Sequence, residues 1–223
     1  MLNTSYKNYM KNDFLELAIE RRSIRKFTDK PVPRELVEYF ISCAVNAPSG
    51  CDSQCWYFIA VDNKELILKL GDAVAEGASN FYGNGYSGAT PQFLHSREKA
   101  VSFFRNAPLV IFVFMDKTQF YDEKAVEAFY EKGYDYRGMI DKLGYYDVLS
   151  IGAAIQNLLL AVSEKGYGAC WMNDPVIAED RIKELLGVQK DLRLLSVIPV
   201  GEPRYVPKPK VLKEQSSILN SFS

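Results

Sequence analysis

A basic segment near the start of the chain holds the residue types best suited to binding an anion. Residues 20–33 read ERRSIRKFTDKPVP and gather Arg21, Arg22, Arg25 and Lys26 around Ser23. Guanidinium groups carry permanent charge and paired donors, and a serine hydroxyl adds a short hydrogen bond, so the pattern suits a phosphomonoester. The alternative is a local role, because cations at a helix C-terminus complement the helix dipole and most charge runs are solvated surface.

A glycine-rich motif, GNGYSG at residues 83–88, matches the dinucleotide-binding pattern G-x-G-x-x-G in letters only. That fingerprint must leave a strand and open a helix, with an acidic residue about 20 positions later. Here AEGASNFY precedes the motif, Thr90-Pro91 follows it, and Pro108 stands where the acid would be sought. We interpret the segment as a flexible loop, which could still cover a substrate.

The cysteines and the single histidine do not form a convincing metal or catalytic motif. Cys51 and Cys55 have only Cys43, Cys170 and His95 as possible partners, and these are isolated in the sequence. The spacing does not match a zinc site, and a histidine without an adjacent nucleophile motif argues against triad chemistry. We therefore predict free thiols and no metal.

Tyrosines are concentrated between residues 121 and 146, and two interpretations of them stay open. They could line an aromatic pocket, or they could be the packing face of amphipathic helices. They are Tyr121, Tyr130, Tyr134, Tyr136, Tyr145 and Tyr146.

The composition is that of an ordinary globular protein. The chain has 223 residues, with 27 Lys and Arg against 28 Asp and Glu, so it has no basic field for nucleic acid. The longest apolar run, residues 107–115, is far shorter than the ~20 residues that span a bilayer, and the polar start resembles no signal peptide. Cysteines without framework spacing predict a reducing compartment, so we expect a cytoplasmic protein that contacts no membrane.

The hydrophobic periodicity predicts helices alternating with short strands. Asp13 and Glu16 form a possible capping box for a helix that ends near residues 21–23, beside the basic cluster. The pattern predicts further helices over 33–47, 64–76, 147–165 and 178–186. It predicts strands over 56–61, 107–115, 168–172 and 194–201. A loop is expected from 77 to about 95, and an extended arm over about 202–223. These elements predict one α+β domain over residues 1–223, in which helices flank a mixed sheet.

Four segments, taken in order, resemble the nitroreductase family of FMN-dependent oxidoreductases. They are RRSIRKF, NAPSGCDSQCWYFIAV, DVLSIGAAIQNLLLAVSEKGYGACWM and IPVGEPRYVPKPK. The resemblance covers residues 13 to 211, and the shared order of four separate motifs makes it specific. It implies a dimeric nitroreductase-like fold, bound FMN, and NADH or NADPH as co-substrate.

The resemblance also implies cofactor-binding roles for particular residues. The FMN phosphate and ribityl chain would be held by Arg21, Arg22, Ser23 and Arg25, with Lys208 and Lys210 from the arm. The flavin ring would be approached by Pro48, Ser49, Asp52 and Gln54. A turn near the cofactor would contain Gly201. The chain departs from the family pattern at Asp52, where Asn is usual, and at Cys55, where Pro is usual. Backbone between residues 171 and 174 is expected to face flavin N5, and no side chain is implied as an essential acid or base.

The implied activity is the transfer of hydride from NADH or NADPH to the flavin, followed by reduction of a nitroaromatic, a quinone or an activated alkene in the same pocket. A homodimer would complete each FMN site, with the apolar face of residues 147–165 as its centre; alternatively this helix is simply the core of a monomer. Two rival functions stay open. One is another reductive chemistry on this scaffold, such as dehalogenation or flavin breakdown, and the other is a flavin-binding regulator or storage protein without turnover.

Overall fold

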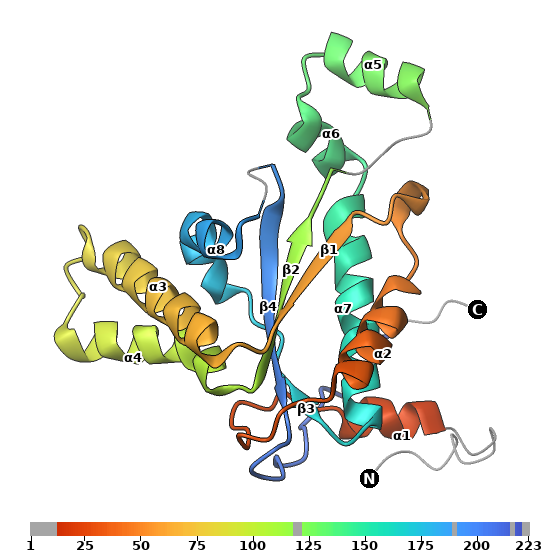
Figure 1. The fold of residues 1–223 in the computed structure, drawn as a ribbon. Coiled ribbons are helices and arrows are strands. Elements are labelled where there is room, and N and C mark those ends of the chain that lie inside the picture. The colour runs from red at the N-terminus through yellow and green to blue at the C-terminus, as the bar shows by residue number, and fades with distance from the viewer. Residues whose placement is uncertain (1–12, 118–121, 189–190, 215–216, 220–223) are drawn as a thin grey trace.

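A four-stranded sheet with helices on both faces organises the chain (Figure 1). The computed structural model describes residues 13–117, 122–188, 191–214 and 217–219. The strands are β1 (Trp56–Val61), β2 (Leu109–Met115), β3 (Gly168–Ala169) and β4 (Arg193–Gly201), in the order β1-β2-β4-β3. The helices are α1 (Asp13–Glu20), α2 (Arg34–Val45), α3 (Lys64–Gly83), α4 (Pro91–Ser102), α5 (Glu123–Glu131), α6 (Tyr136–Lys142), α7 (Tyr146–Glu164) and α8 (Glu179–Leu186), with short 3-10 helices at Gly50–Asp52, Phe103–Asn106 and Asp174–Ala178. The predicted α+β class is confirmed.

The central strand β2 carries the core on both of its faces. Its sequence, LVIFVFM, is a continuous run of β-formers, and every residue of it is buried. Successive side chains of a strand point to opposite faces of the sheet. Phe112 and Phe114 accordingly belong to one apolar cluster, while Ile111 and Val113 belong to the other.

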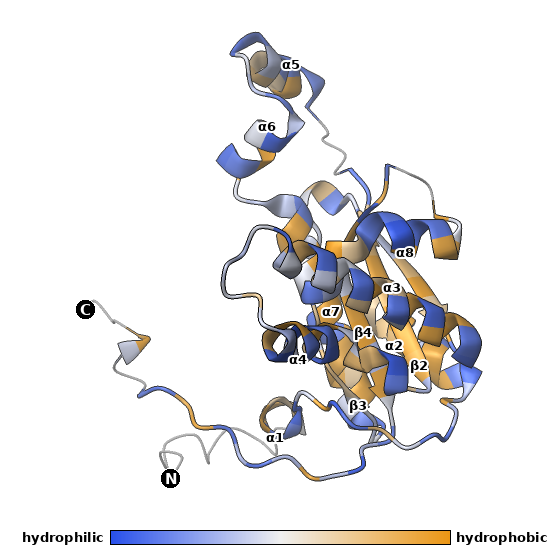
Figure 2. Cartoon of the chain, turned by 90° about the vertical axis from the view of Figure 1, so that its left-hand side faces the viewer, coloured by the Kyte–Doolittle hydropathy of each residue, from blue (hydrophilic) through white to orange (hydrophobic). Residues whose placement is uncertain are grey.

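Different helices cover the two faces of the sheet. On one face α3 and α8 bury Ile67, Leu70 and Ile182. On the other face α2 and α7 bury Phe40 and Leu158. Figure 2 shows the apolar residues gathered in the sheet and in the helices that pack on it. The core thus consists of two layers separated by the sheet.

The region between β1 and β2 differs from its prediction. Helix α3 continues to Gly83 rather than ending near residue 76, and the loop before α4 is correspondingly short. Thr90-Pro91, which fell inside the loop predicted to reach about residue 95, begins α4. The Thr90 side chain accepts a hydrogen bond from the Phe93 N–H at 3.2 Å, and Pro91 is the first helical residue. The glycine-rich motif 83–88 is therefore mostly a turn between two helices.

The pairing of the strands also refines the prediction. All pairs of neighbouring strands are antiparallel, and the parallel component expected of a mixed sheet is limited, in the described residues, to an isolated bridge between Ser23 and Ala169. Strand β1 was expected to be buried, but it lies at the edge of the sheet and only Val61 in it is buried. An edge strand packs on one neighbour only, which explains its exposure.

Helix α7 runs along the whole of one sheet face. It is the one helix of the described residues long and apolar enough to cross a membrane by length and composition, but half of that stretch is buried inside the fold. Nine of its residues are buried, including Ile151, Ile155 and Leu159. Packing on the sheet therefore accounts for the buried half of this apolar stretch. Its end is marked by Gly166, whose φ of 75° is the left-handed conformation typical after a helix.

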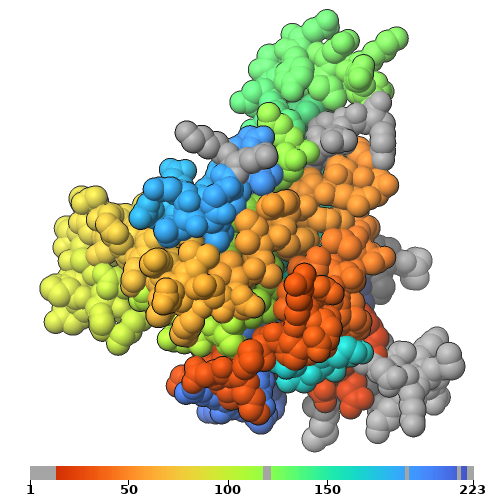
Figure 3. All heavy atoms as spheres, in the orientation of Figure 1, coloured from red at the N-terminus to blue at the C-terminus, as the bar shows by residue number. Residues whose placement is uncertain are grey.

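Helices α5 and α6 form a hairpin that projects from the body (Figures 1 and 3). Helix α5 buries none of its residues, whereas α6 buries Met139 and Ile140. The hairpin is therefore attached to the rest of the molecule through α6. The tyrosines predicted to form a pocket or a packing face lie in or near this hairpin, apart from Tyr121, which is outside the described residues.

Candidate cofactor site

The basic segment, residues 21–26, is held in place by pairing with strand β3. The Ile24 N–H donates to the Ala169 carbonyl at 2.9 Å, and Ser23 forms a bridge with the same residue. Ile24 is buried, and it packs so closely on Gly168 that a Cβ there would lie 2.5 Å from the Ile24 side chain. Because alternate residues of an extended segment face opposite ways, anchoring Ile24 inward directs Ser23 and Arg25 away from the core.

The C-terminal arm lies beside this basic segment. The Thr28 N–H donates to the Glu202 carbonyl at 2.9 Å, and the Arg204 N–H donates to the Lys26 carbonyl at 3.1 Å. Farther along the arm, the Arg22 guanidinium donates to the carbonyl of Lys208. The structure thus brings Lys208 to the basic segment, and Lys210 is exposed two residues beyond it.

A cavity of about 230 Å³ opens between the basic segment, the end of α7 and the arm. Arg21 and Arg22 line it from one side, and Tyr167, Tyr205 and Pro207 line it from the others. Of the residues predicted for phosphate binding, Arg21 and Arg22 therefore line this hollow, and Ser23, Arg25, Lys208 and Lys210 lie outside its lining. Sequence spacing alone could not show which surface the arm would reach.

Cys170 is a neighbour of this cluster that the sequence did not assign to it. Its thiol lies close enough to Ser23 to share a hydrogen bond and to feel the charges of Arg25 and Arg21. Burial raises the pKa of the Cys170 thiol, and those three groups oppose the rise only in part. Cys170 therefore stays neutral and leaves the guanidiniums available to an external anion.

The second predicted group, the 48–54 loop, lies elsewhere, against the first turns of α7. The Gly50 N–H donates to Ser150 Oγ at 3.0 Å. Within the loop, the Gln54 N–H donates to Ser49 Oγ at 3.2 Å, and Gln54 Nε2 donates to Asp52 Oδ1 at 3.3 Å. Pro48, like Asp52 and Gln54, is exposed. The structure thus gathers the predicted ring-facing residues in one loop.

The conformation of the 48–54 loop is unusual. Cys51, Asp52 and Gln54 have φ of 54°, 50° and 46°, a left-handed backbone conformation that residues other than glycine rarely adopt. Gly50 is required by packing, because a Cβ there would lie 2.8 Å from Tyr146 Cβ. The hydroxyl of Ser53 is buried without a hydrogen-bond partner in the described part of the chain. Strain together with an unsatisfied polar atom is typical of a ligand-binding loop.

The two groups lie at opposite ends of α7 in one chain (Figure 1). The 48–54 loop contacts Tyr146 and Ser150, whereas the cavity at the basic segment reaches Ser163 and Gly166. A helix rises about 1.5 Å per residue, so these contacts are roughly 20 Å apart along the helix axis. The predicted site residues therefore form two clusters rather than one.

Two further predicted positions have clear local roles. Trp171, in the segment expected near flavin N5, donates from Nε1 to the buried Ser196 Oγ at 2.8 Å, and Ser196 Oγ donates to Asn173 Oδ1 at 3.3 Å. These bonds fix the backbone after β3. Gly201 is buried, and a Cβ there would lie 2.7 Å from the ring of Pro108, so close packing alone explains this glycine.

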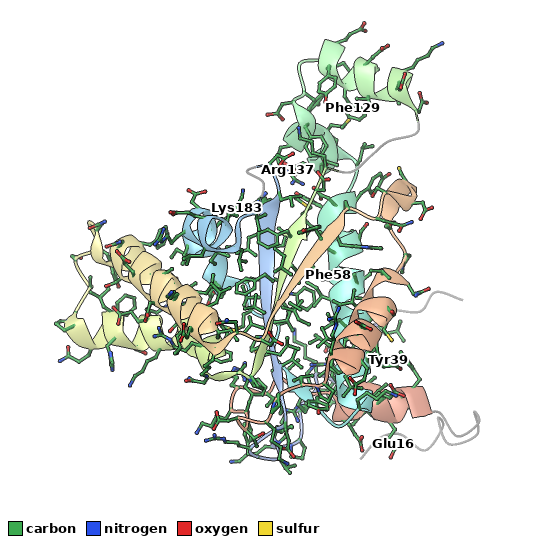
Figure 4. The ribbon with its side chains drawn as sticks, viewed as in Figure 1. Glu16, Tyr39, Phe58, Phe129, Arg137 and Lys183 are labelled. Atoms are coloured by element: carbon green, nitrogen blue, oxygen red, sulfur yellow. The ribbon has the colours of Figure 1, made fainter. Side chains whose placement is uncertain are left out.

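An ion pair next to the 48–54 loop, buried on its Asp147 side, escaped the sequence reasoning. Asp147 is fully buried at the start of α7 and receives Nη1 and Nη2 of Arg137 at 3.1 and 3.4 Å (Figure 4 labels Arg137). Arg137 belongs to α6, so this pair joins the hairpin to α7. No local pattern in the sequence indicated that Asp147 would be buried or paired.

Comparison with known proteins identifies the family of this chain. A model of the nitroreductase family matches residues 18–202. The iodotyrosine deiodinase of Thermotoga neapolitana is 27% identical over 197 residues, which cover 87% of this chain and 90% of the relative.

Solved structures share the fold. Oxidized iodotyrosine deiodinase bound to FMN and 3-iodo-L-tyrosine superposes with a TM-score of 0.66 at 26% identity, covering 94% of this chain and 98% of the other. A BluB-like flavoprotein from Clostridium difficile reaches 0.80 at 24% identity with the same coverage of both chains. Since the family model spans most of its length, the chain belongs to the nitroreductase family.

Proposed function

We propose that this protein is an FMN-dependent oxidoreductase that uses NADH or NADPH to reduce a nitroaromatic, a quinone or a related acceptor. One observation carries the proposal: the chain presents a basic cavity closed by its own arm at one end of α7, and a strained loop at the other end. Membership of the family and the FMN bound to a structural relative support the choice of cofactor.

The residues present fit FMN. The phosphate and the ribityl chain would be held by the basic segment, through Arg21, Ser23 and Arg25, together with Lys208 and Lys210 of the arm. These residues offer several cationic donors on two neighbouring segments, which the contact of Arg22 with the Lys208 carbonyl holds together. Ser49, Asp52 and Gln54 would approach the flavin ring, and the unpartnered hydroxyl of Ser53 marks a place where a ligand atom could complete the hydrogen bonding of this loop.

When bound, FMN would accept a hydride, that is one proton with two electrons, from NADH or NADPH and pass it to a second substrate in the same pocket, in a ping-pong sequence. The chain supplies position rather than proton transfer. Its bonds from Trp171 through Ser196 to Asn173 fix the backbone that is expected to face the reactive edge of the ring. We expect no side chain to be an essential acid or base.

The functional unit in this proposal is a homodimer with FMN at its interface. Because the basic segment and the 48–54 loop lie at opposite ends of α7, one flavin would take its phosphate contacts from one chain and its ring contacts from the other. The chain exposes apolar residues suited to such an interface. They are Phe14, Leu15 and Ile19 of α1, Val45 of α2, Val148 and Leu149 of α7, and Val206, Val211 and Leu212 of the arm.

An open hollow of about 840 Å³ lies between α1, α2 and α7, three helices that carry some of these exposed apolar residues. Figure 4 labels Glu16 and Tyr39, which line this hollow. Leu17, Leu160 and Ala161 line it, so it offers an apolar floor to a second copy. A cytoplasmic location and the absence of nucleic-acid and membrane partners complete the proposal.

A second candidate is reductive dehalogenation. It is favoured by the similarity to the deiodinase of Thermotoga neapolitana and to the deiodinase structure with bound iodotyrosine. Both candidates need the same flavin site and differ only in the acceptor.

Anaerobic stopped-flow spectroscopy of the FMN-loaded protein tests the proposal. We expect NADH or NADPH to bleach the flavin rapidly and an acceptor from a panel of quinones, nitroaromatics and 3-iodo-L-tyrosine to restore it. Iodide release from the last compound would select dehalogenation. Tight FMN binding without bleaching by either nicotinamide would contradict the enzyme and favour a flavin-binding regulator or storage protein.

A further inference from the structure

The first turn of α7, residues 146–150, holds the 48–54 loop by several contacts. The Gly50 N–H donates to Ser150 Oγ at 3.0 Å, and Ser150 Oγ itself donates to the Tyr146 carbonyl. Tyr146 also packs so closely on Gly50 that no Cβ would fit there. Just beyond the loop, the buried Cys55 thiol donates to the Asp147 carbonyl at 3.9 Å. The position of the loop therefore follows the position of this turn.

The loop depends on such external support. Its left-handed residues Cys51, Asp52 and Gln54 have a conformation that persists only where the surrounding structure holds it. The hydrogen bonds inside the loop, from Gln54 to Ser49 and to Asp52, are exposed to water, which competes for them. The contacts with the first turn of α7 are therefore the main support of the loop.

The first turn of α7 is in its own right poorly capped. Tyr145, the residue before the helix, has φ of 61° and its side chain makes no capping bond. The carboxylate of Asp147 takes over part of that role, because its Oδ1 accepts a hydrogen bond from the Val148 N–H at 2.7 Å. The conformation of the turn thus depends on a fully buried charge.

Arg137 of α6 is the cation that makes this burial tolerable. Its Nη1 and Nη2 donate to the two carboxylate oxygens of Asp147, and its Nε donates to Asp141 of the same helix at 3.3 Å. A buried carboxylate that loses its cation is strongly unfavourable, so the turn would have to move to bring Asp147 to water. Figure 4 shows Arg137 in the hairpin, next to the start of α7.

We propose that Arg137 is a positioning residue for the flavin. By pairing with Asp147 it fixes the first turn of α7, and this turn holds the 48–54 loop in the conformation that contacts the flavin ring. The inference rests on the proposed function, which assigns the ring to this loop. Arg137 acts through Asp147 and the turn and needs no contact with FMN.

The test measures the loop through its own cysteine, in the full-length protein freed of FMN. Cys51 and Cys43 are partly exposed, whereas Cys55 and Cys170 are buried. A brief pulse of iodoacetamide is followed by mass spectrometry of the cysteine peptides, with Cys43 of α2 as the internal reference. In Arg137→Met the labelling of Cys51 relative to Cys43 should rise at least roughly tenfold, because local opening of the loop becomes easier.

Two variants of the same network make this result specific. Arg137→Lys keeps a cation beside Asp147, so its labelling ratio should lie much closer to that of the parent. Asp141→Asn removes the exposed partner of Arg137 and leaves the pair with Asp147, so its ratio should equal that of the parent. If Arg137→Met does not fold, Asp147→Asn replaces it, with a smaller rise expected in the same direction.

A core variant separates the loop from general stability. Ile182 of α8 is fully buried on the other face of the sheet, and Ile182→Ala leaves a cavity there. Urea unfolding should show that this variant is destabilised, as Arg137→Met is. The labelling ratio of Ile182→Ala should nevertheless stay at the parent value, because its defect lies away from the first turn of α7.

FMN provides the second readout. The affinity of Arg137→Met for FMN should fall roughly tenfold, because only a fraction of the molecules then hold the loop in the binding conformation. The visible circular dichroism of the bound flavin should change as well, since it reports the contacts of the ring. Ile182→Ala should keep both the affinity and the dichroism of the parent.

An unchanged labelling ratio in Arg137→Met would overturn the inference, as would an equal rise in Ile182→Ala. Increased labelling with parent-like FMN affinity and dichroism would also overturn it, because the loop would then be supported without positioning the flavin. Failure of the proposed function is distinguishable, because it would appear in the parent as bound FMN that neither nicotinamide bleaches, and the labelling requires no flavin.

Discussion

The two ends of α7 achieve their shapes by different means. At the basic segment, regular pairing between Ile24 and Ala169 and between Thr28 and Glu202 presents charged side chains on an unstrained framework. At the 48–54 loop, backbone in the left-handed region is held against a helix whose first turn buries the charge of Asp147. One end relies on side-chain charge, and the other relies on conformation.

This difference has consequences for what mutations should do. At the basic segment, charged side chains would bind the ligand from an unstrained backbone. Removing one of them should therefore weaken ligand binding and leave the fold intact. At the 48–54 loop, the site depends on a backbone conformation that neighbouring side chains hold in place. Removing one of those side chains should therefore lower the free energy of unfolding before it affects binding. The predictions below test that contrast, from the largest expected effect to the smallest.

The largest effect should follow from Arg137→Met at the loop end. It leaves the fully buried Asp147 carboxylate without its cationic partner. Breaking a fully buried pair costs about 3–5 kcal/mol, and because the Arg137 side chain is 36% exposed we expect a loss at the lower end of that range. Urea unfolding of the parent and variant measures the loss. Arg34→Met is the matched control, because its ion pair with Glu38 is exposed and its removal should leave the midpoint unchanged.

The double variant Arg137→Met with Asp147→Asn sharpens this prediction. Removing the charge as well as its partner should recover a substantial part of the lost stability, because the remaining amide is easier to bury than a carboxylate. Equal stability of the single and double variants would show that Arg137 acts through packing rather than through charge.

Removal of FMN should give the next largest effect, because each flavin would need both ends of α7 from different chains. A ligand that binds only the dimer stabilises it by about 2.7 kcal/mol at a free concentration 100-fold above its Kd. Sedimentation velocity of the flavin-free protein at low concentration should therefore show monomer, and added FMN should restore the dimer. A monomer that holds FMN stoichiometrically would refute the shared site.

The sequence was a good guide wherever a local pattern decided the structure. The run LVIFVFM predicted β2, and the apolar repeat from residue 147 predicted α7, because burial on both sides leaves a continuous or wide apolar pattern. Local patterns also predicted the basic segment, from its cluster of charges, and the extended arm, from its prolines. The contact of Arg22 with Lys208 joins residues far apart in sequence. Only the family resemblance suggested that the basic segment and the arm belong to one site.

The sequence was a poor guide where tertiary packing overrides local preference. Helix α3 runs past residue 76 through glycine and asparagine because Ala78 is buried and Tyr82 packs edge-on against Phe93 of α4, with ring centres 5.9 Å apart. Likewise, no local pattern indicates a left-handed tyrosine or a buried Asp147. Strain and buried charge depend on neighbours that the sequence does not identify.

At the basic segment, Arg25→Ala and Arg21→Ala should each weaken FMN binding by roughly 1.5–3 kcal/mol, the range of a charge-assisted hydrogen bond. Fluorescence titration of the flavin-free protein measures the affinity, and urea unfolding should show little change. Lys30→Ala is the control, because Lys30 is already engaged by Glu202 at 3.0 Å on the exposed side of the segment. Unchanged affinity in both arginine variants would remove the phosphate assignment.

The smallest effect concerns Asp52, where the family usually has asparagine. If the 48–54 loop faces the flavin ring, a carboxylate there opposes the negative charge that accumulates on reduction, so Asp52→Asn should raise the two-electron potential. The residue is exposed and its carboxylate accepts a hydrogen bond from Gln54 Nε2, so solvent and that bond both weaken the opposition. We therefore expect an increase below ~30 mV, which corresponds to less than about 1.4 kcal/mol. Redox titration of both proteins measures the two-electron potential of the flavin. An unchanged or lowered potential in the variant would mean that the Asp52 charge does not affect the flavin, and that the loop acts through its backbone alone.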